Sequence, residues 1–124
     1  MRSTYGPSAL GLLCLLLSGN ALAAPRIEAG MIVAANGRTL YVFDNDVTGS
    51  GKSVCVGPCQ GIHPPYVAAQ GETAKEPWSF VIRDDGSRQW AYKGRALYRF
   101  YADERKGTTG GDGLNRNTWH VARP

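Results

Sequence analysis

The chain has 124 residues, of which 43% are hydrophobic and 19% are charged, so it is long enough for one small hydrophobic core but not for two. Its formal net charge is +4 at neutral pH, a mild excess that fits either a solvated surface or contact with anionic polymers of the cell envelope. A nucleic-acid partner is not expected, because the sequence contains no basic and aromatic binding motif.

The first residues have the features of a secretory signal peptide. Arg2 supplies a positive charge, Ala9 to Leu17 is an apolar run, and Ala21-Leu22-Ala23 is a small-x-small cleavage site. We expect cleavage after Ala23, because cleavage one residue later would place Pro25 next to the scissile bond. The apolar run is shorter than the roughly 20 residues that span a bilayer. A retained N-terminal anchor is the alternative.

The predicted organisation is therefore a leader over residues 1–23 and one domain over residues 24–124, located in the periplasm or secreted. Lipid attachment at Cys14 is not expected, because the bulky Leu12 and Leu13 occupy positions where a lipoprotein signal has small residues. The mature chain has no predicted transmembrane segment. It retains Cys55 and Cys59, and neighbouring thiols in an oxidising compartment usually pair, so we predict a disulfide.

An internal repeat organises the predicted domain. The ten residues from Gly37 to Asp46 align with those from Gly94 to Asp103, and six of the ten positions are identical. In each copy a β-prone run leads into a turn dipeptide, and a second run follows, which is typical of a β-hairpin. The hairpins are expected over Met31–Ala35 and Arg38–Asp44, with Asn36-Gly37 between, and over Arg88–Tyr92 and Arg95–Tyr101, with Lys93-Gly94 between. The two half-repeats cover approximately residues 30–66 and 87–124.

In the second predicted strand of the first hairpin, side chains alternate between faces, which places Tyr41 and Phe43 on one face and Leu40 and Val42 on the other. Tyr98 and Phe100 occupy the matching positions of the second copy, and we interpret all these aromatics as packing within or between the hairpins. Further elements are a strand from Trp78 to Ile82, a turn at Asp84-Asp85-Gly86, a closing strand from Trp119 to Val121, and short helices within Cys55–Ile62 or Val67–Ala74. The predicted fold is mainly β, a small domain of two related β-hairpin halves.

These residues resemble a known family. The pattern Tyr-x-Phe-x-x-Asp occurs at Tyr41, Phe43 and Asp46 and again at Tyr98, Phe100 and Asp103. Together with the Cys55 and Cys59 pair and the Pro64-Pro65 step, it is similar to the bacterial secreted-repeat family of predicted lipoproteins named for a Yx(FWY)xxD motif. The resemblance, from about Gly30 to Pro124, implies an envelope location and two related halves, but no activity. Two features depart from the family: the lipid-attachment box is missing, and His63 replaces a tryptophan.

The segment with Cys55, Cys59 and His63 is the main candidate for chemistry. Its C-x3-C-x3-H spacing is similar to the ligand loop of the binuclear copper site in respiratory oxidases, and two thiolates with an imidazole suit copper. However, Tyr66 stands where that loop has a methionine, and no histidine lies upstream. A structural disulfide worth about 2 kcal/mol is the preferred interpretation. A copper-binding or redox-active pair is the alternative.

Two loops carry weaker signals. Asp44-Asn45-Asp46 imitates the opening of a calcium loop, but we prefer to interpret Asp46 and Asp103 as turn caps. Gly107 to Gly113 is predicted to be a mobile loop, with presentation of its backbone amides to an anion as the alternative.

Catalysis is not expected, because His63 and His120 are the only imidazoles and no serine lies in a nucleophile-elbow motif. The predicted function is a non-catalytic envelope or secreted module, binding or structural, without a cofactor. Its partner would be an envelope protein, a cell-wall polymer or a small ligand. The alternative is a periplasmic copper-binding or thiol-redox accessory protein that uses Cys55, Cys59 and His63.

Overall fold

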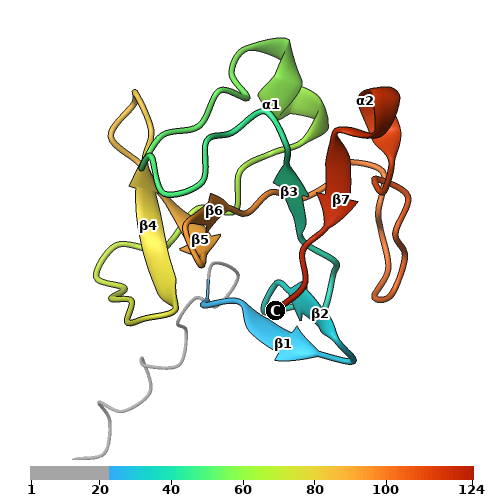
Figure 1. The fold of residues 1–124 in the computed structure, drawn as a ribbon. Helices are drawn as coiled ribbons and strands as arrows, with labels where there is room; N and C mark the ends of the chain where they lie inside the picture. Colours follow the sequence, from blue (N-terminus) through green and yellow to red (C-terminus); the bar gives the residue numbers. More distant parts are fainter. Residues whose placement is uncertain (1–22) are drawn as a thin grey trace, which may run out of the picture.

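A computed structural model of the chain describes residues 23–124, which form short strands joined by long loops (Figure 1). The predicted leader and Cys14 lie outside the described residues, so cleavage after Ala23 stays a prediction. None of the helices in residues 23–124 has the length and apolar character needed to cross a membrane.

The strands form three small antiparallel sheets, and the prediction of a small, mainly β domain is confirmed. β1 pairs with β2, β3 pairs with β7, and β4, β5 and β6 form the third sheet. The elements in chain order are β1 (Arg26–Glu28), β2 (Met31–Val33), β3 (Tyr41–Phe43), α1 (Pro58–Ile62), β4 (Trp78–Ile82), β5 (Arg88–Tyr92), β6 (Arg95–Ala96), α2 (Leu114–Asn117) and β7 (Trp119–Val121).

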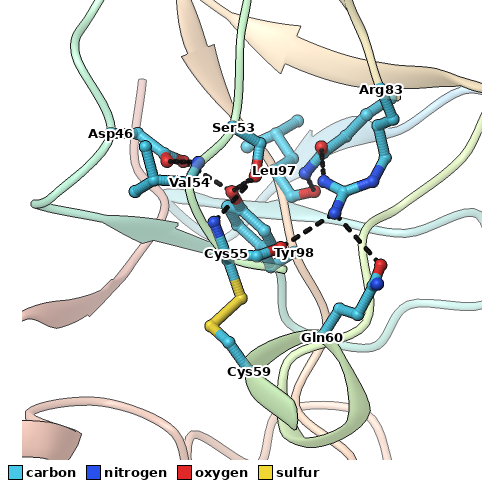
Figure 2. Close-up of a disulfide and its surroundings, with 10 residues drawn as sticks. Asp46, Ser53, Val54, Cys55, Cys59, Gln60, Arg83, Leu97 and Tyr98 are labelled. Atoms are coloured by element: carbon cyan, nitrogen blue, oxygen red, sulfur yellow. Dashed lines mark hydrogen bonds between the residues drawn. A yellow bond between two sulfur atoms is a disulfide. The ribbon is translucent and has the colours of Figure 1, made fainter. Parts of the chain in front are cut away.

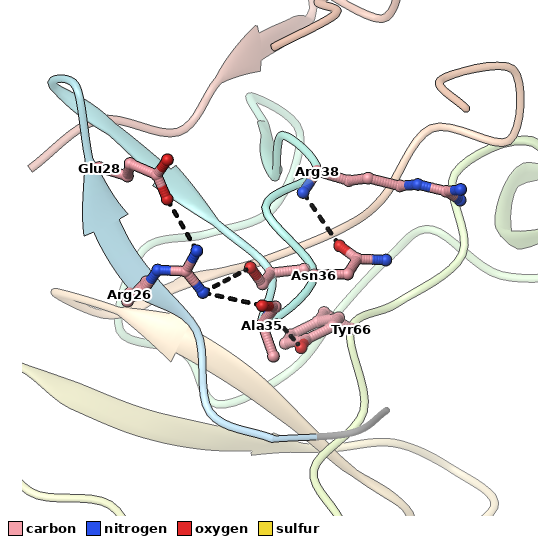
Figure 3. Close-up of polar contacts among 7 residues, drawn as sticks. Arg26, Glu28, Ala35, Asn36, Arg38 and Tyr66 are labelled. Carbon is pink, nitrogen blue, oxygen red and sulfur yellow. Dashed lines mark hydrogen bonds and ion pairs between the residues drawn. The ribbon is translucent and has the colours of Figure 1, made fainter. Parts of the chain in front are cut away.

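The turn of the first hairpin lies at Asn36-Gly37, as the sequence predicts. The amide of Ala34 donates to the carbonyl of Arg38 over 2.8 Å, so the loop between them has three residues. Gly37 takes a φ of 87°, a conformation that side chains rarely allow, which is typical of a three-residue hairpin loop. The Asn36 side chain accepts a hydrogen bond from the amide of Arg38 (2.9 Å), which fixes the turn locally (Figure 3).

Two distant side chains hold this turn from outside (Figure 3). Arg26 of β1 donates to the carbonyl of Ala35 over 2.8 Å and pairs with Glu28, also at 2.8 Å. The hydroxyl of Tyr66 accepts from the amide of Ala35 at 3.0 Å. The exposed strand β1 is thereby attached to the rest of the domain.

The second hairpin is tighter than the first. Tyr92 of β5 pairs with Arg95 of β6, and the two residues between them, Lys93 and Gly94, have φ of 48° and 81°. Two consecutive positive φ angles are the mark of a type I′ turn, whose twist matches that of the flanking strands. β4 pairs with the other side of β5, and the predicted turn between β4 and β5 is closed by the amide of Gly86 and the carbonyl of Arg83 (2.9 Å).

The two halves join at equivalent positions of the repeat. The amide of Tyr41 donates to the carbonyl of Tyr98 over 2.8 Å, and the amide of Tyr98 donates back to the carbonyl of Tyr41 over 2.9 Å. This reciprocal exchange relates the halves by an approximate two-fold rotation. The prediction that the two hairpins pack against each other is confirmed.

Each half also pairs with a further extended segment on its outer side. The amide of Ala122, just after β7, donates to the carbonyl of Leu40 over 2.9 Å. The amide of Tyr66 donates to the carbonyl of Leu97 over 3.0 Å, and Leu97 is the repeat equivalent of Leu40. Tyr66 and Ala122 are therefore also equivalent, although their surrounding sequences share little.

The core consists of two clusters of buried residues, and β3 contributes to both. Leu40 and Val42 pack in one cluster with Ile32, Trp90 and Leu97, whereas Tyr41 and Phe43 pack in the other with Tyr98 and Trp119. The predicted alternation of faces is confirmed. β3 is buried on both faces because one face packs in each cluster.

Some predicted boundaries differ from the structure. Val67–Ala74 contains no helix, and the strand expected over Arg95–Tyr101 continues after β6 only as single bridges at Tyr98. β1 was not predicted, because its three residues are exposed and show no apolar alternation. α2 was not predicted either, since Asn115, Arg116 and Asn117 have φ of 52°, 59° and 63° and form a left-handed turn without an amphipathic pattern.

Candidate functional site

The family motif residues form two reciprocal pairs across the joint between the halves. The hydroxyl of Tyr41, in the first copy, donates to the carboxylate of Asp103 in the second. The hydroxyl of Tyr98, in the second copy, donates to the carboxylate of Asp46 in the first, at 2.5 Å. Each tyrosine is fully buried at the joint, so the motif connects the two halves rather than organising either half alone.

Each carboxylate of these pairs also holds the loop that follows it. Asp103 accepts a second hydrogen bond, from the amide of Gly110 (3.0 Å), while the amide of Gly111 donates to the hydroxyl of Tyr41 (3.2 Å). Added Cβ atoms at Gly110 or Gly111 would lie about 3.0–3.1 Å from Tyr41, Phe100 or Asp103, so glycine permits this close approach. One amide of the glycine-rich loop, that of Gly110, therefore donates to an anion, and that anion is the internal carboxylate of Asp103.

In the first half, the hydroxyl of Ser53 takes the role that the amide of Gly111 has in the second half, as the donor to the motif tyrosine. The side chain of Asp46 accepts from the amide of Val54 at 2.8 Å, and the hydroxyl groups of Ser53 and Tyr98 lie 2.6 Å apart. Because the Tyr98 hydroxyl donates its hydrogen bond to Asp46, its oxygen accepts the hydrogen bond from the hydroxyl of Ser53. Burial, together with the neighbouring carboxylate, raises the pKa of Tyr98 far above its usual range, and the pKa of Tyr41 is raised for the same reasons.

An aromatic stack crosses the centre of the domain. The rings of Phe43 and Trp119 are nearly parallel with centroids 4.2 Å apart, and the His63 ring stacks on the other side of Trp119 at 3.6 Å. Phe100 follows His63 at 5.5 Å. His63 and Trp119 lie three residues before the equivalent Tyr66 and Ala122, so the two stacked rings occupy matching places in the two halves.

The predicted disulfide is present between Cys55 and Cys59 and spans the start of α1 (Figure 2). Cys55 is fully buried and belongs to the core cluster around Trp119, whereas Cys59 is half-buried. Pro58 begins the helix, where a proline costs no hydrogen bond, and the amide of His63 closes it on the carbonyl of Cys59 at 2.9 Å.

Arg83 holds the disulfide loop from the side of β4, and sequence reasoning missed it (Figure 2). Its guanidinium donates to the carbonyl of Cys55 (2.8 Å) and to the side chains of Gln60 (3.0 Å) and Gln89 (2.7 Å). All three acceptors are neutral oxygens. An arginine usually lies at the surface, and nothing in a single sequence distinguishes this buried one.

The residues of the proposed copper site are adjacent but differently engaged. Cys55 and Cys59 are bonded to each other, and His63 stacks on Trp119 with its Nδ1 buried and without a hydrogen-bond partner. Burial lowers the pKa of His63. Within residues 23–124, no group of three or more His, Cys, Asp or Glu side chains is arranged to hold a metal ion.

The aspartates of the calcium-like segment point to different partners. Asp46 binds Tyr98 and Val54, as described above, whereas Asp44 pairs with His120 at 2.7 Å and with Arg95 at 3.3 Å. The oxygen ligands that alternate in the sequence are therefore separated. His120 is a half-exposed residue of β7, in agreement with its interpretation as a strand residue.

One cavity was not foreseen from the sequence. It has a volume of about 280 Å³ and lies between β2, the β5–β6 turn and the segment that follows β7. Its walls are apolar residues of both halves, and three cationic side chains, Lys93, Arg95 and Arg123, line it as well. These segments are distant in the sequence, so no local pattern could have revealed the cavity.

Comparisons with known proteins agree with this architecture. A family model described as a secreted repeat of unknown function, Lipoprotein_15, matches residues 28–66 and again residues 79–123. No curated protein and no solved structure matches the chain. The two matches contain the two Tyr-x-Phe-x-x-Asp motifs, which the structure joins through reciprocal hydrogen bonds. The chain therefore belongs to the Lipoprotein_15 family of secreted repeats, for which no function is known.

Proposed function

We propose that this protein is an exported, non-catalytic binding module that acts in the periplasm or outside the cell, after removal of the leader behind Ala23. The supporting observation is how its buried polar groups are used. The motif tyrosines, Asp103 and Arg83 form hydrogen bonds to other groups within the domain, and these bonds hold its halves and loops together. The disulfide and the family description support an oxidising compartment.

The partner would be an envelope protein, a cell-wall polymer or a small ligand, contacted through the loops between strands. These loops contain four of the eight exposed large apolar side chains of residues 23–124, namely Val47, Val54, Val56 and Tyr101, and the chain as a whole has a mild basic excess. Loops on a rigid frame are a common place for binding residues.

An amide chemical-shift titration of the labelled mature chain tests this proposal. The added materials would be cell-wall polymer fragments and a small-molecule extract from the native host, followed by mass spectrometry of the extract. A binding module gives saturable shifts in loop amides and leaves the added compounds unchanged. Chemical conversion of any added compound, or no shift with either material, would contradict the proposal.

The second candidate is a thiol-redox or copper-binding function of Cys55, Cys59 and His63. The observation that favours it is the buried Nδ1 of His63, which has no partner and belongs to the residue that closes the disulfide helix. A dithiol reductant would transfer two electrons and two protons to the disulfide, becoming a disulfide itself and leaving two free thiols four residues apart in the chain. Two thiolates and an imidazole suit Cu(I).

This candidate is tested by anaerobic competition between the reduced chain and a chromophoric Cu(I) chelator. Binding of one Cu(I), weakened about tenfold or more in His63→Ala but not in His120→Ala, would support it. Equal affinities of the two variants, or no binding after complete reduction, would contradict it.

A further inference from the structure

Strand β4 leaves one of its edges without a partner strand. It is the end strand of the sheet formed by β4, β5 and β6, and it has β5 on one side only (Figure 1). Together with β5 it is the longest strand of residues 23–124. It pairs with β5 in an unbroken register, from Trp78 opposite Tyr92 to Ile82 opposite Arg88. The other edge of β4 is therefore continuous along the whole strand.

The hydrogen bond just after β4 shows which of its backbone groups face outwards. The amide of Arg83 donates to the carbonyl of Ser87 over 2.9 Å, so the backbone of Arg83 faces the β5 side. Backbone direction alternates along an antiparallel strand, so Phe80 and Ile82 direct their amide and carbonyl groups away from β5. Within residues 23–124, these groups have no hydrogen-bond partner.

β4 also lacks the features that usually protect an exposed sheet edge. Short length, charged side chains, prolines and bulges prevent such an edge from pairing with another chain. β1 occupies the corresponding place beside β2 in the first half, and it has only three residues, of which Arg26 and Glu28 are charged. β4 has five residues, Trp-Ser-Phe-Val-Ile, none of them charged. The edge of β4 is therefore open to a further strand.

Apolar side chains accompany this open edge. Ile82 is 56% exposed, and Trp78 and Phe80 lie half-buried on the same face of the strand. Val56 is 52% exposed and lines the same small hollow as Ile82, so it extends the apolar surface at that end. A strand added to the edge would cover these side chains as well as the free backbone groups.

We propose that β4 pairs with β4 of a second copy of this chain, antiparallel and centred on Phe80, independently of the proposed binding function. In this register the amide of each Phe80 donates to the carbonyl of the other Phe80. The amide of each Ile82 donates to the carbonyl of Trp78 in the other copy. The side chains then meet as Phe80 with Phe80 and Ile82 with Trp78, and apolar pairs directly opposite each other stabilise antiparallel strands. Both copies use the same patch, so the assembly closes as a dimer.

The second copy is the favoured occupant because the edge is complementary to itself. Its outward-facing groups are distributed evenly about Phe80, so one two-fold rotation pairs them in register. The charges beyond the strand ends are mixed, with Lys75 and Glu76 before β4 and Asp84 and Asp85 after it. In the dimer Lys75 of one copy would face Asp85 of the other, whereas Glu76 would face Asp84. These flanks favour neither a basic nor an acidic foreign segment, so backbone and apolar pairing decide the partner.

Sedimentation equilibrium of the mature chain tests this proposal. We expect a dimer with a dissociation constant at or below about 0.1 mM. Ile82→Pro removes one outward-facing amide from each copy without removing a bond to β5, and it should raise the dissociation constant about tenfold or more. Ile82→Val is the matched control, since it keeps the amide. A chain that stays monomeric at about 1 mM, or an equal effect of the two variants, would overturn the proposal.

A second pair of variants leaves the backbone of β4 unchanged, in case proline disturbs the strand. Ile82→Lys places a charge on the edge and should also weaken the dimer about tenfold or more. Val47→Lys adds the same charge in a loop, at a side chain that is 69% exposed, and should leave the dimer intact. The amide spectrum of each variant reports whether it is folded. Equal weakening by both lysines would mean that only net charge matters and would overturn the proposal.

An isotope-filtered NOE experiment on mixed labelled and unlabelled chains locates the interface. In the proposed register Ser79 lies opposite Val81 of the other copy as a pair without mutual hydrogen bonds, in which the Cα atoms are about 4.5 Å apart. An NOE between their α protons is therefore expected. A dimer whose intermolecular NOEs come from another surface would overturn the proposal. None of these measurements uses an added ligand, so their failure leaves the proposed binding function intact.

Discussion

The two reciprocal tyrosine and aspartate pairs should contribute unequally to the stability of the domain. Tyr41→Phe removes one hydroxyl group and leaves the ring in place. Asp103 then loses its bond from Tyr41 and keeps the bond from Gly110, although only 6% of its surface is exposed. The buried amide of Gly111 loses its acceptor as well. Tyr98→Phe, in contrast, leaves Asp46 without its donor and Ser53 without its acceptor, and water can reach both because both are half-exposed.

The expected magnitudes follow from this difference in burial. A hydrogen bond to a charged group contributes about 1.5–3 kcal/mol, and the loss is largest where the remaining group stays buried. We expect Tyr41→Phe to reduce the free energy of unfolding by roughly 3 kcal/mol and Tyr98→Phe by roughly 1.5 kcal/mol. For a domain of this size, 1 kcal/mol corresponds to about 4–8 °C, so Tyr41→Phe should lower Tm by roughly 12–24 °C.

Urea unfolding followed by tryptophan fluorescence measures these values, because Trp119 lies in the core next to the joint (its ring centroid is 5.0 Å from that of Tyr98). Tyr101→Phe is the matched control and should change stability by less than about 0.5 kcal/mol, since Tyr101 is 66% exposed. A double-mutant cycle of Tyr41→Phe with Asp103→Asn should give a coupling energy of at least about 1 kcal/mol. Zero coupling, or a larger loss in Tyr98→Phe than in Tyr41→Phe, would refute the reasoning.

The same pairs predict a decline of stability at alkaline pH. Burial raises the pKa of Tyr41 and Tyr98 in the folded state, so the unfolded chain releases protons that the folded chain retains. Stability is therefore fully present below the ordinary tyrosine pKa of about 10 and falls as the pH rises above it. The urea midpoint between about pH 9 and pH 11 should decline less steeply in Tyr98→Phe than in the unaltered chain.

Three further predictions concern the disulfide and the residues around it. Cys55→Ala/Cys59→Ala should remain folded but lose about 2 kcal/mol in urea unfolding, because the closed loop is short, and an unchanged midpoint would contradict this. Burial lowers the pKa of His63, so the stabilisation by its neutral ring is present above about pH 6.5 and is lost as the pH falls. His63→Phe should therefore make the free energy of unfolding depend less on pH below about 6.5, and an unaltered pH dependence would count against this reasoning. Arg83→Lys should lower the free energy of unfolding by about 2 kcal/mol, since an ammonium cannot reach all three acceptors of the guanidinium. A loss below about 0.5 kcal/mol would show that the planar guanidinium is not needed to hold these acceptors.

The sequence predicted the parts of the fold that depend on neighbouring residues. Alternation along Trp78 to Ile82 matches β4, and the dipeptides Asn36-Gly37 and Lys93-Gly94 lie at the hairpin turns. The separation of Tyr41 and Phe43 from Leu40 and Val42 follows from the two-residue period of a strand, and both sets are buried as such a pattern allows.

What the sequence could not supply was the partner of each polar group. The motif marks Tyr41 and Asp46 together, yet neither binds the other, because each pairs with the opposite copy. The stacking of His63 on Trp119 would have become visible only by aligning the segments before Tyr66 and Ala122, which share almost no residue identity. The cavity depends on three separate segments of chain meeting, which is a property of the tertiary fold alone.

The crossed tyrosine and aspartate bonds have a consequence for stoichiometry. A chain with a single copy of the repeat would have one tyrosine without an acceptor and one aspartate without its donor. The two backbone hydrogen bonds between Tyr41 and Tyr98 would also be missing. Such a chain could complete these bonds only by associating with a second chain of the same kind. We therefore expect this repeat to occur in even numbers, either along one polypeptide or through dimerisation.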